Sequence, residues 1–375
     1  MATAATPEEL RDFVEQLVGP MVLKPDRTVA RINNTNLGGD RSWCDAITSG
    51  GRIRTRDPGV MSGPPGGNLA QVLVSSADRI RGGTARKRRS SVILLSSAQA
   101  SEMLNQFQHG NQSRTSLDLG KTETAVSLQE GYVHLSNEAR VSLDNLRRIA
   151  NCEDAIFAVW EGTVEKVIRF SNATLRTYKL RPTADWPALE ISGILMHRIK
   201  GTTPKRDAEA KLRLVSPVHG AVLDTCMGLG YTAILAASTA DSVTAIEKDD
   251  NVLEMARLNP YSQSLFQEPK IKLIHGDATQ VIPGFGNALF DIVNHDPPTL
   301  RIAGELYADA FYAHLLRILK PGGKLLHYTG APGSRGRRVD LAASVTRRLA
   351  RVGFAKVHHD SETSCVVAAR PSGRL

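Results

Sequence analysis

At 375 residues, with 41% hydrophobic residues and a formal net charge of +9, the chain is long enough for two globular domains. No apolar run approaches the roughly 20 residues of a membrane-spanning helix, and four scattered cysteines form neither a metal-binding pair nor a disulfide framework. We therefore predict a globular protein with no membrane partner and no bound metal, in a reducing, cytoplasmic or nuclear compartment.

The first 95 residues are predicted to contain one short helix followed by a disordered segment. Within residues 1–20, the apolar residues of Pro7–Val18 recur at helical spacing. The acidic residues of this segment argue against a mitochondrial transit peptide. Residues 21–95 form a basic segment, in which thirteen Lys and Arg against five Asp up to Ser91 account for nearly the whole net charge. This segment has one aromatic residue and buries too little apolar surface to fold. Its run Arg86–Arg89 could be a nuclear address or an RNA-binding tail.

Residues 96–204 are predicted to form a small β-rich domain. Helical spacing is found in SSAQASEMLNQF and NEARVSLDNLRRIA, whereas TAVSLQEGYVHL, AIFAVWEGTVEKVIRF and TLRTYKL alternate apolar and polar residues around turn signals. We expect this domain to help select a substrate. Its sequence has no pattern of aromatic and basic residues that would identify RNA as that substrate.

From residue 205 to residue 375 the pattern changes to short apolar strands. The candidate strands are AVLDTC, SVTAIE, IKLIHG, FDIVNH, GKLLHYT, FAKVHH and CVVAAR. Helical patterns separate the first five, as parallel βαβ units require, but only DSETS separates the last two, which should form an antiparallel hairpin. The predicted fold class is α/β: a doubly wound, Rossmann-like, mostly parallel sheet of seven strands with an antiparallel last strand.

The first of these strands runs into a glycine turn, DTCMGLGYTA, which fits the loose dinucleotide-binding pattern GxGxxA at Gly228, Gly230 and Ala233. A tight turn without a ligand would also explain the glycines. However, the turn lies between a strand and a helix, and Glu247 ends the next strand, where an acid can bind ribose hydroxyls. Because glycine has no Cβ, the backbone can approach a ligand closely. The turn therefore indicates a ribose-containing ligand.

Acidic residues at three successive strand ends distinguish between two such ligands. Asp224 would repel the pyrophosphate of NAD, but it suits the ammonium group and the cationic sulfur of S-adenosylmethionine. Asp277 follows the third strand and can accept a hydrogen bond from an adenine amino group. The sequence thus predicts S-adenosylmethionine as the cofactor, bound by Asp224, Gly228, Gly230, Glu247 and Asp277.

Residues from about 211 to 370 resemble the class I S-adenosylmethionine-dependent methyltransferases. From about residue 116 onward, the chain more narrowly resembles a group of predicted methyltransferases described mainly from archaea. The segments that carry this resemblance are DLGKT, ISGILMHR, DTCMGLGYTAI, IEKD, LNP, HDPP, AGELY and HYTGAPG. The resemblance implies the fold and the cofactor but no substrate. Cys226 departs from the class, in which many members have the first glycine of a GxGxG loop at this position.

The segment FDIVNHDPPTL ends the fourth strand, whose carboxyl end faces the transferred methyl group in this fold. It resembles the D/N-P-P-aromatic motif of amino-group methyltransferases, in which the first side chain and a proline carbonyl orient the target nitrogen. This resemblance makes Asp296 and His295 candidate catalytic residues and Pro297 and Pro298 candidate substrate contacts. Thr299 replaces the aromatic residue that would stack a base. A simple strand-terminating turn is the alternative interpretation.

Tyr307, His327 and Tyr328 are further candidate substrate contacts, although such aromatics and a buried histidine also occur as ordinary core residues. The segment AGELYADAFYAHLL, which contains Tyr307, resembles the corresponding helix of spermidine synthases. The predicted function is an S-adenosylmethionine-dependent methyltransferase acting on a nitrogen of RNA, a protein side chain or a small amine. One alternative is a spermidine-synthase-like aminopropyltransferase, although this chain lacks the Gly-Asp-Gly loop that is typical of those synthases. The other alternative is an inactive cofactor-binding scaffold. The oligomeric state does not follow from the sequence.

Overall fold

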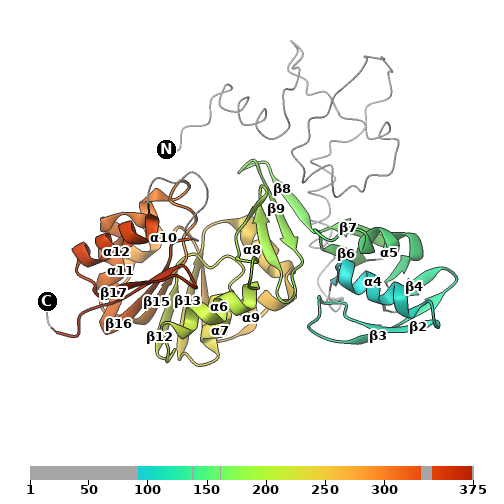
Figure 1. Ribbon diagram of the computed structural model, residues 1–375, viewed down its shortest axis with the longest axis horizontal. Helices are drawn as coiled ribbons and strands as arrows, with labels where there is room; N and C mark the ends of the chain where they lie inside the picture. Colours follow the sequence, from blue (N-terminus) through green and yellow to red (C-terminus); the bar gives the residue numbers. More distant parts are fainter. Residues whose placement is uncertain (1–91, 137–138, 161, 331–339, 374–375) are drawn as a thin grey trace, which may run out of the picture. The chain divides into compact units, whose positions relative to one another are not determined.

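The computed structural model describes residues 92–136, 139–160, 162–330 and 340–373 (Figure 1). The helix expected in residues 1–20 and nearly all of the basic segment at 21–95 lie outside these residues. Within the described part, every helix is too short or too polar to cross a bilayer. Of the described cysteines, Cys226 and Cys365 are free.

The first described part of the chain contains two small antiparallel sheets, with strand orders β1-β6-β7 and β2-β3-β4-β5. Two helices, α4 and α5, pack against each other. Helix α5 begins where the Ser142 hydroxyl accepts a hydrogen bond from the Asn145 N–H. The elements are β1 (Ile93–Leu95), α4 (Ser97–Gln106), β2 (Gln112–Thr115), β3 (Thr124–Gln129), β4 (Tyr132–His134), β5 (Arg140–Ser142), α5 (Leu143–Ala150), β6 (Phe157–Trp160) and β7 (Thr163–Lys166).

A third antiparallel sheet, with the order β11-β10-β9-β8, follows and completes the predicted β-rich region. Its strands are β8 (Ile168–Ser171), β9 (Arg176–Arg181), β10 (Ala188–Ile191) and β11 (Ile194–Leu195). Ser192 and Gly193, between the last two strands, have φ angles of 47° and 78°, as a two-residue hairpin turn requires. The hydroxyl of the buried Tyr178 donates to Asp249 Oδ2 at 2.6 Å, so this sheet is hydrogen-bonded to the part of the chain that follows.

The rest of the chain builds a sheet of seven strands in the order β14-β13-β12-β15-β16-β18-β17, which confirms the predicted fold class. The first five strands along the chain are parallel, whereas β18 is antiparallel to both β16 and β17. The strands are β12 (Ala221–Asp224), β13 (Ser242–Glu247), β14 (Ile271–His275), β15 (Phe290–His295), β16 (Leu319–Tyr328), β17 (Ala355–Asp360) and β18 (Cys365–Ala369). The strand order reverses between β12 and β15, which is where ligands bind in open sheets of this kind.

Helices cover both faces of this sheet (Figure 1). One face carries α6 (Pro204–Arg213), α7 (Tyr231–Ala237), α8 (Asp250–Leu258) and α9 (Ser264–Gln267), and the other carries α10 (Ala278–Val281), α11 (Asp309–Ile318) and α12 (Leu341–Val352). Neighbouring strand residues alternate between the two cores, since Val222 packs into the first and Leu223 into the second. Burial on both faces explains the continuous apolar runs of the strands.

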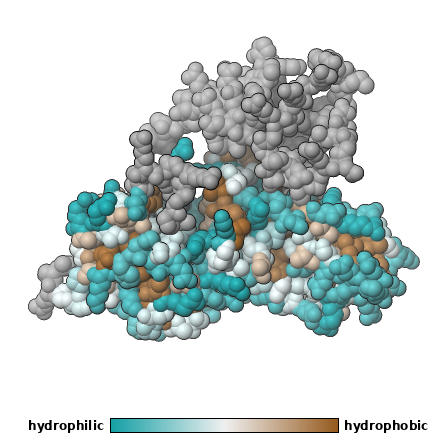
Figure 2. Space-filling view, viewed as in Figure 1, coloured by the Kyte–Doolittle hydropathy of each residue, from teal (hydrophilic) through white to brown (hydrophobic). Residues whose placement is uncertain are grey.

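Hydrophilic residues predominate on the described surface shown in Figure 2, where hydrophobic residues gather only in small patches. This is the surface expected when the apolar faces of a sheet are covered by helices.

Candidate functional site

Asp224 ends β12 with its side chain buried, 1% of the residue being exposed. Its Oδ2 accepts a hydrogen bond from the Thr232 hydroxyl of α7 at 2.5 Å, whereas its buried Oδ1 receives no hydrogen bond of good geometry from the described residues. Burial raises the pKa of Asp224 to about 6. A buried acceptor without a partner costs stability, so this oxygen is suited to a donor on a ligand.

Glu247 ends β13 and faces the glycine turn. Its Oε2 accepts the Gly228 N–H at 3.0 Å, and its Oε1 accepts the Asp249 N–H at 2.9 Å. Burial raises the pKa of Glu247 to about 7 in spite of these two hydrogen bonds. A Cβ atom on Gly228, whose φ is 58°, would meet no atom within 4 Å, so the space above the turn is open. Gly230 instead packs tightly, because a Cβ there would lie 2.4 Å from Leu265.

Asp277 caps the N-terminus of α10, two residues after β14. Its Oδ1 accepts hydrogen bonds from both the N–H and the hydroxyl of Thr279, at 2.9 and 2.7 Å, and its Oδ2 lies 3.4 Å from Lys248 Nζ. Burial acts to raise the pKa of Asp277, but the hydrogen bonds from Thr279 outweigh it and lower the pKa. Asp224, Glu247 and Asp277 thus lie at or just beyond the carboxyl ends of three adjacent strands, as the sequence predicts.

Asp296 directly follows β15, the strand next to β12 on its other side. Its Oδ2 lies 2.8 Å from Nζ of Lys211, a residue of α6 that the sequence analysis missed. The other oxygen, Oδ1, has no hydrogen-bond partner among the described residues, and the side chain is 30% exposed. One edge of the carboxylate is therefore fixed, and the other edge is open.

His295 lies in the core, and both of its ring nitrogens are engaged. Nε2 lies 3.0 Å from the carbonyl oxygen of Leu306, in η4 (Gly304–Tyr307), and Nδ1 lies 2.7 Å from the Thr225 hydroxyl. Because a carbonyl only accepts, Nε2 carries the proton and Nδ1 accepts from Thr225. Burial lowers the pKa of His295 to about 4. In this geometry His295 links η4, which follows β15, to Thr225, the residue after β12. It has no nitrogen free to take a proton.

His327 and two of the predicted aromatic contacts form a second buried group. His327 Nε2 lies 2.9 Å from the Tyr312 hydroxyl and Nδ1 lies 2.9 Å from the carbonyl of Tyr328, so this ring is also fully hydrogen-bonded. The hydroxyl of the buried Tyr307 donates to the Pro298 carbonyl at 3.0 Å and supports the Asp-Pro-Pro turn. The ring of the half-buried Tyr328 lies under Lys211, with Nζ 4.1 Å from the ring centroid.

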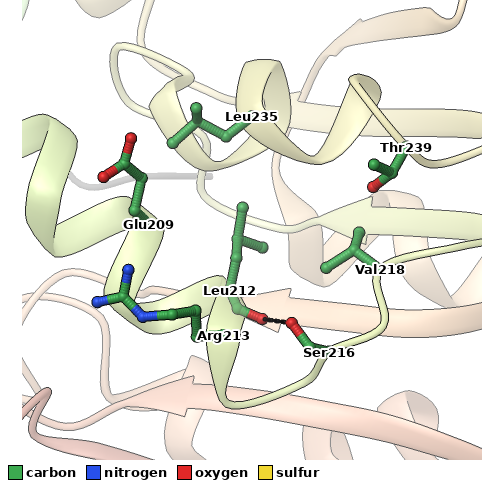
Figure 3. Close-up of a pocket in the computed structure, with 7 residues that line it drawn as sticks. All are labelled: Glu209, Leu212, Arg213, Ser216, Val218, Leu235 and Thr239. Atoms are coloured by element: carbon green, nitrogen blue, oxygen red, sulfur yellow. Dashed lines mark hydrogen bonds between the residues drawn. The ribbon is translucent and has the colours of Figure 1, made fainter.

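A shallow hollow of about 270 Å³ lies away from these strand ends, between α6 and α7 (Figure 3). Ser216 and Val218 precede β12, and Thr239 precedes β13, so the hollow is at the amino ends of the strands. Its remaining lining residues are Glu209, Leu212, Arg213 and Leu235. It carries no convergent set of acidic groups. Among the described residues, no three His, Cys, Asp or Glu side chains are placed to hold a metal ion.

Comparison with known proteins places a methyltransferase domain over residues 222–323, which contain the glycine turn and all four acids at the strand ends. An uncharacterized protein of the archaeon Methanocaldococcus jannaschii is 45% identical over 259 residues, covering 68% of this chain and 88% of the relative. Polyamine aminopropyltransferase 2 of Streptomyces coelicolor is 26% identical over 152 residues, covering 37% of this chain and 27% of that enzyme.

Among solved structures, a spermidine synthase in complex with the transition state analogue AdoDATO is 18% identical and covers 56% of this chain and 77% of the synthase, with a TM-score of 0.44. A likeness this distant identifies no substrate.

Proposed function

Because the chain belongs to the class I methyltransferase-like family that includes the Methanocaldococcus jannaschii protein, we propose that it transfers a methyl group from S-adenosylmethionine to a nitrogen atom of an acceptor. The observation that carries this proposal is the placement of four acids at the carboxyl ends of four adjacent strands. Three of them lie at or just beyond the ends of β12, β13 and β14, and the fourth, Asp296, has one oxygen without a hydrogen-bond partner among the described residues. The four acids outnumber the two lysines that pair with them, Lys211 and Lys248, so the site is acidic on balance and suits a cationic nucleoside better than a dinucleotide.

The residues at the turn fit the chemical groups of S-adenosylmethionine, which supplies an activated methyl group on a cationic sulfur. Glu247 would accept hydrogen bonds from the ribose hydroxyls, and the open space at Gly228 would let the nucleoside approach the backbone. Asp224 Oδ1, which receives no hydrogen bond of good geometry from the described residues, would accept one from the ammonium group, and this would remove the cost of burying the oxygen without a partner. Asp277 would lie beside the adenine amino group.

The acceptor nitrogen would be oriented by the Asp296 carboxylate and the Pro297 carbonyl, so that its lone pair faces the methyl group. Most of the acceleration would then come from positioning in a site that excludes water. We assign no proton transfer to His295, because both of its nitrogens are hydrogen-bonded in the core. We assign no proton transfer to Tyr328 either, because burial raises the pKa of its hydroxyl to about 12, so the hydroxyl stays neutral. The acceptor can be RNA, protein or a small amine.

The affinity for S-adenosylmethionine is expected to fall as the pH is lowered through 7. The pKa of Glu247 is raised to about 7, so below this value its protonated form predominates and cannot accept two hydroxyl donors. The dissociation constant should rise about fourfold between about pH 8.5 and about pH 6.5. Calorimetric titrations across this range measure the effect. Glu247→Gln, which does not titrate, should bind weakly at every pH, and an equal pH dependence in this variant would contradict the assignment.

An aminopropyltransferase is the second candidate, because part of the chain is similar to the Streptomyces coelicolor enzyme. Asp224 would attract the ammonium group of S-adenosylmethionine and of its decarboxylated form alike, so the two must be compared directly. As a methyltransferase, the protein should bind S-adenosylmethionine at least as tightly as the decarboxylated compound. A clear preference for the decarboxylated compound would favour aminopropyl transfer. Binding of neither compound would contradict both enzymatic candidates.

A further inference from the structure

Four charged side chains of alternating sign form a continuous chain that ends at Asp296. Arg198 donates to Asp207 Oδ1 at 2.8 Å, and Lys211 Nζ lies 3.1 Å from Asp207 Oδ2 and 2.8 Å from Asp296 Oδ2. Asp207 and Lys211 are one turn apart on α6, whereas Arg198 follows β11 and Asp296 follows β15. The contacts therefore connect the carboxyl end of the fourth parallel strand with the segment that leaves the β-rich region.

Lys211 is the centre of this chain and has little freedom to move. Its side chain is only 7% exposed, and the ammonium group meets two carboxylates and the face of the Tyr328 ring. Burial acts to lower the pKa of Lys211, but the carboxylates of Asp296 and Asp207 outweigh it and raise the pKa above its usual value. The group therefore stays charged, and a buried charge with fixed partners holds those partners in place.

The two oxygens of Asp296 are consequently not equivalent. Oδ2 is held by Lys211, and Oδ1 has no hydrogen-bond partner among the residues that the structure describes. A carboxylate fixed at one oxygen presents the other in a defined direction, which is what orienting an N–H of an acceptor requires. Without Lys211, the side chain would be free to rotate, and Asp207 and Asp296 would face each other across the vacated position.

We infer that Lys211 is a positioning residue for methyl transfer, which holds Asp296 Oδ2 so that Oδ1 points at the acceptor nitrogen. This inference rests on the proposed function, since it assigns Asp296 to the acceptor. Lys211 acts only through Asp296 and touches neither substrate. Asp207 and Arg198 fix Lys211 from the other side.

A double-mutant cycle tests this inference. The readout is the initial rate of label transfer from tritiated S-adenosylmethionine into extract of a strain that lacks the gene. Lys211→Met is expected to lower the rate about tenfold in the wild-type background and less than about twofold in the Asp296→Ala background. A merely structural role would lower the rate by the same factor in both backgrounds and would overturn the inference. Lys205→Met is the matched control, because Lys205 lies on the same helix, is 44% exposed and has only two distant contacts among the described residues, 3.8 Å from Glu209 and 5.7 Å from the centroid of the Trp186 ring.

A crystal structure of Lys211→Met tests separately whether Lys211 orients Asp296, and it does so without any acceptor, so a failure of this inference can be told from a failure of the proposed function. The Asp296 carboxylate should leave its wild-type orientation in this variant and keep it in Lys205→Met. An unchanged orientation in Lys211→Met would overturn the inference. If thermal unfolding shows that Lys211→Met does not fold, Lys211→Gln replaces it in both measurements with the same expected results, because its amide can still donate to Asp207.

Discussion

Replacing Asp296 with alanine is expected to lower the rate of methyl transfer by about 10²-fold or more and to change the affinity for S-adenosylmethionine little. The side chain has one oxygen fixed by Lys211 and one oxygen open, so its removal takes away the group that orients the acceptor. In the proposed site the cofactor would be bound by other residues. The rate is measured by label transfer into cell extract, and the affinity by calorimetry on the same preparation.

Two further variants test whether the effect of Asp296→Ala is due to loss of the Asp296 carboxylate itself. Asp296→Asn should be nearly as inactive, because the amide oxygen will turn toward the Lys211 ammonium and leave an NH₂ group facing the acceptor. Asp241→Ala removes an exposed acid directly before β13, at the amino ends of the parallel strands and so away from the site. This variant should retain full activity. An Asp296→Ala protein with normal turnover and weakened cofactor binding would place Asp296 at the cofactor instead of the acceptor.

Replacing Glu247 with alanine is expected to weaken S-adenosylmethionine binding at least tenfold. Each hydrogen bond to a charged acceptor contributes roughly 1.5–3 kcal/mol, so losing both ribose hydrogen bonds in full would weaken binding by about 10²-fold or more. The same change frees the Gly228 and Asp249 N–H groups, whose acceptor it removes. Calorimetry on the purified variant measures the loss, and thermal unfolding establishes that the variant is folded.

Glu209→Ala is the matched control for Glu247→Ala, since Glu209 is a partly exposed glutamate of α6 that lines the hollow away from the site (Figure 3). Its affinity for S-adenosylmethionine should equal that of the wild type. Unaltered affinity in Glu247→Ala would refute the assigned role. Because an acid at this position can also bind the ribose of NAD, NAD is titrated in parallel, and tight binding of NAD would overturn the choice of cofactor.

The seven-stranded sheet could be predicted from the sequence because each of its signals is local. A strand such as β12 is covered by helices on both faces, so its residues before Asp224 are apolar, and Val222 and Leu223 enter different cores. The short connection between β17 and β18 allowed only a hairpin, which the antiparallel register confirms. The strand-end acids were recognisable because a carboxylate that ends an apolar run is unusual.

The partners of the candidate site residues could not be predicted, because they come from distant parts of the chain. Lys211 and Asp296 are 85 residues apart in sequence. The only local signal for Lys211 was its position on the buried face of α6, one turn after Asp207. The Thr225 hydroxyl and the Leu306 carbonyl occupy both nitrogens of His295, and nothing in the segment HDPPTL indicates these contacts.

The most direct test of the central claim is to incubate the purified protein and tritiated S-adenosylmethionine with extract of a strain that lacks the gene, and then to separate RNA, protein and small molecules. Our account predicts that the wild type transfers label into one of these fractions. The rate of this transfer should be about 10²-fold lower with Asp296→Ala. Label that enters no fraction, although the protein binds S-adenosylmethionine, would contradict the account and indicate a cofactor-binding scaffold.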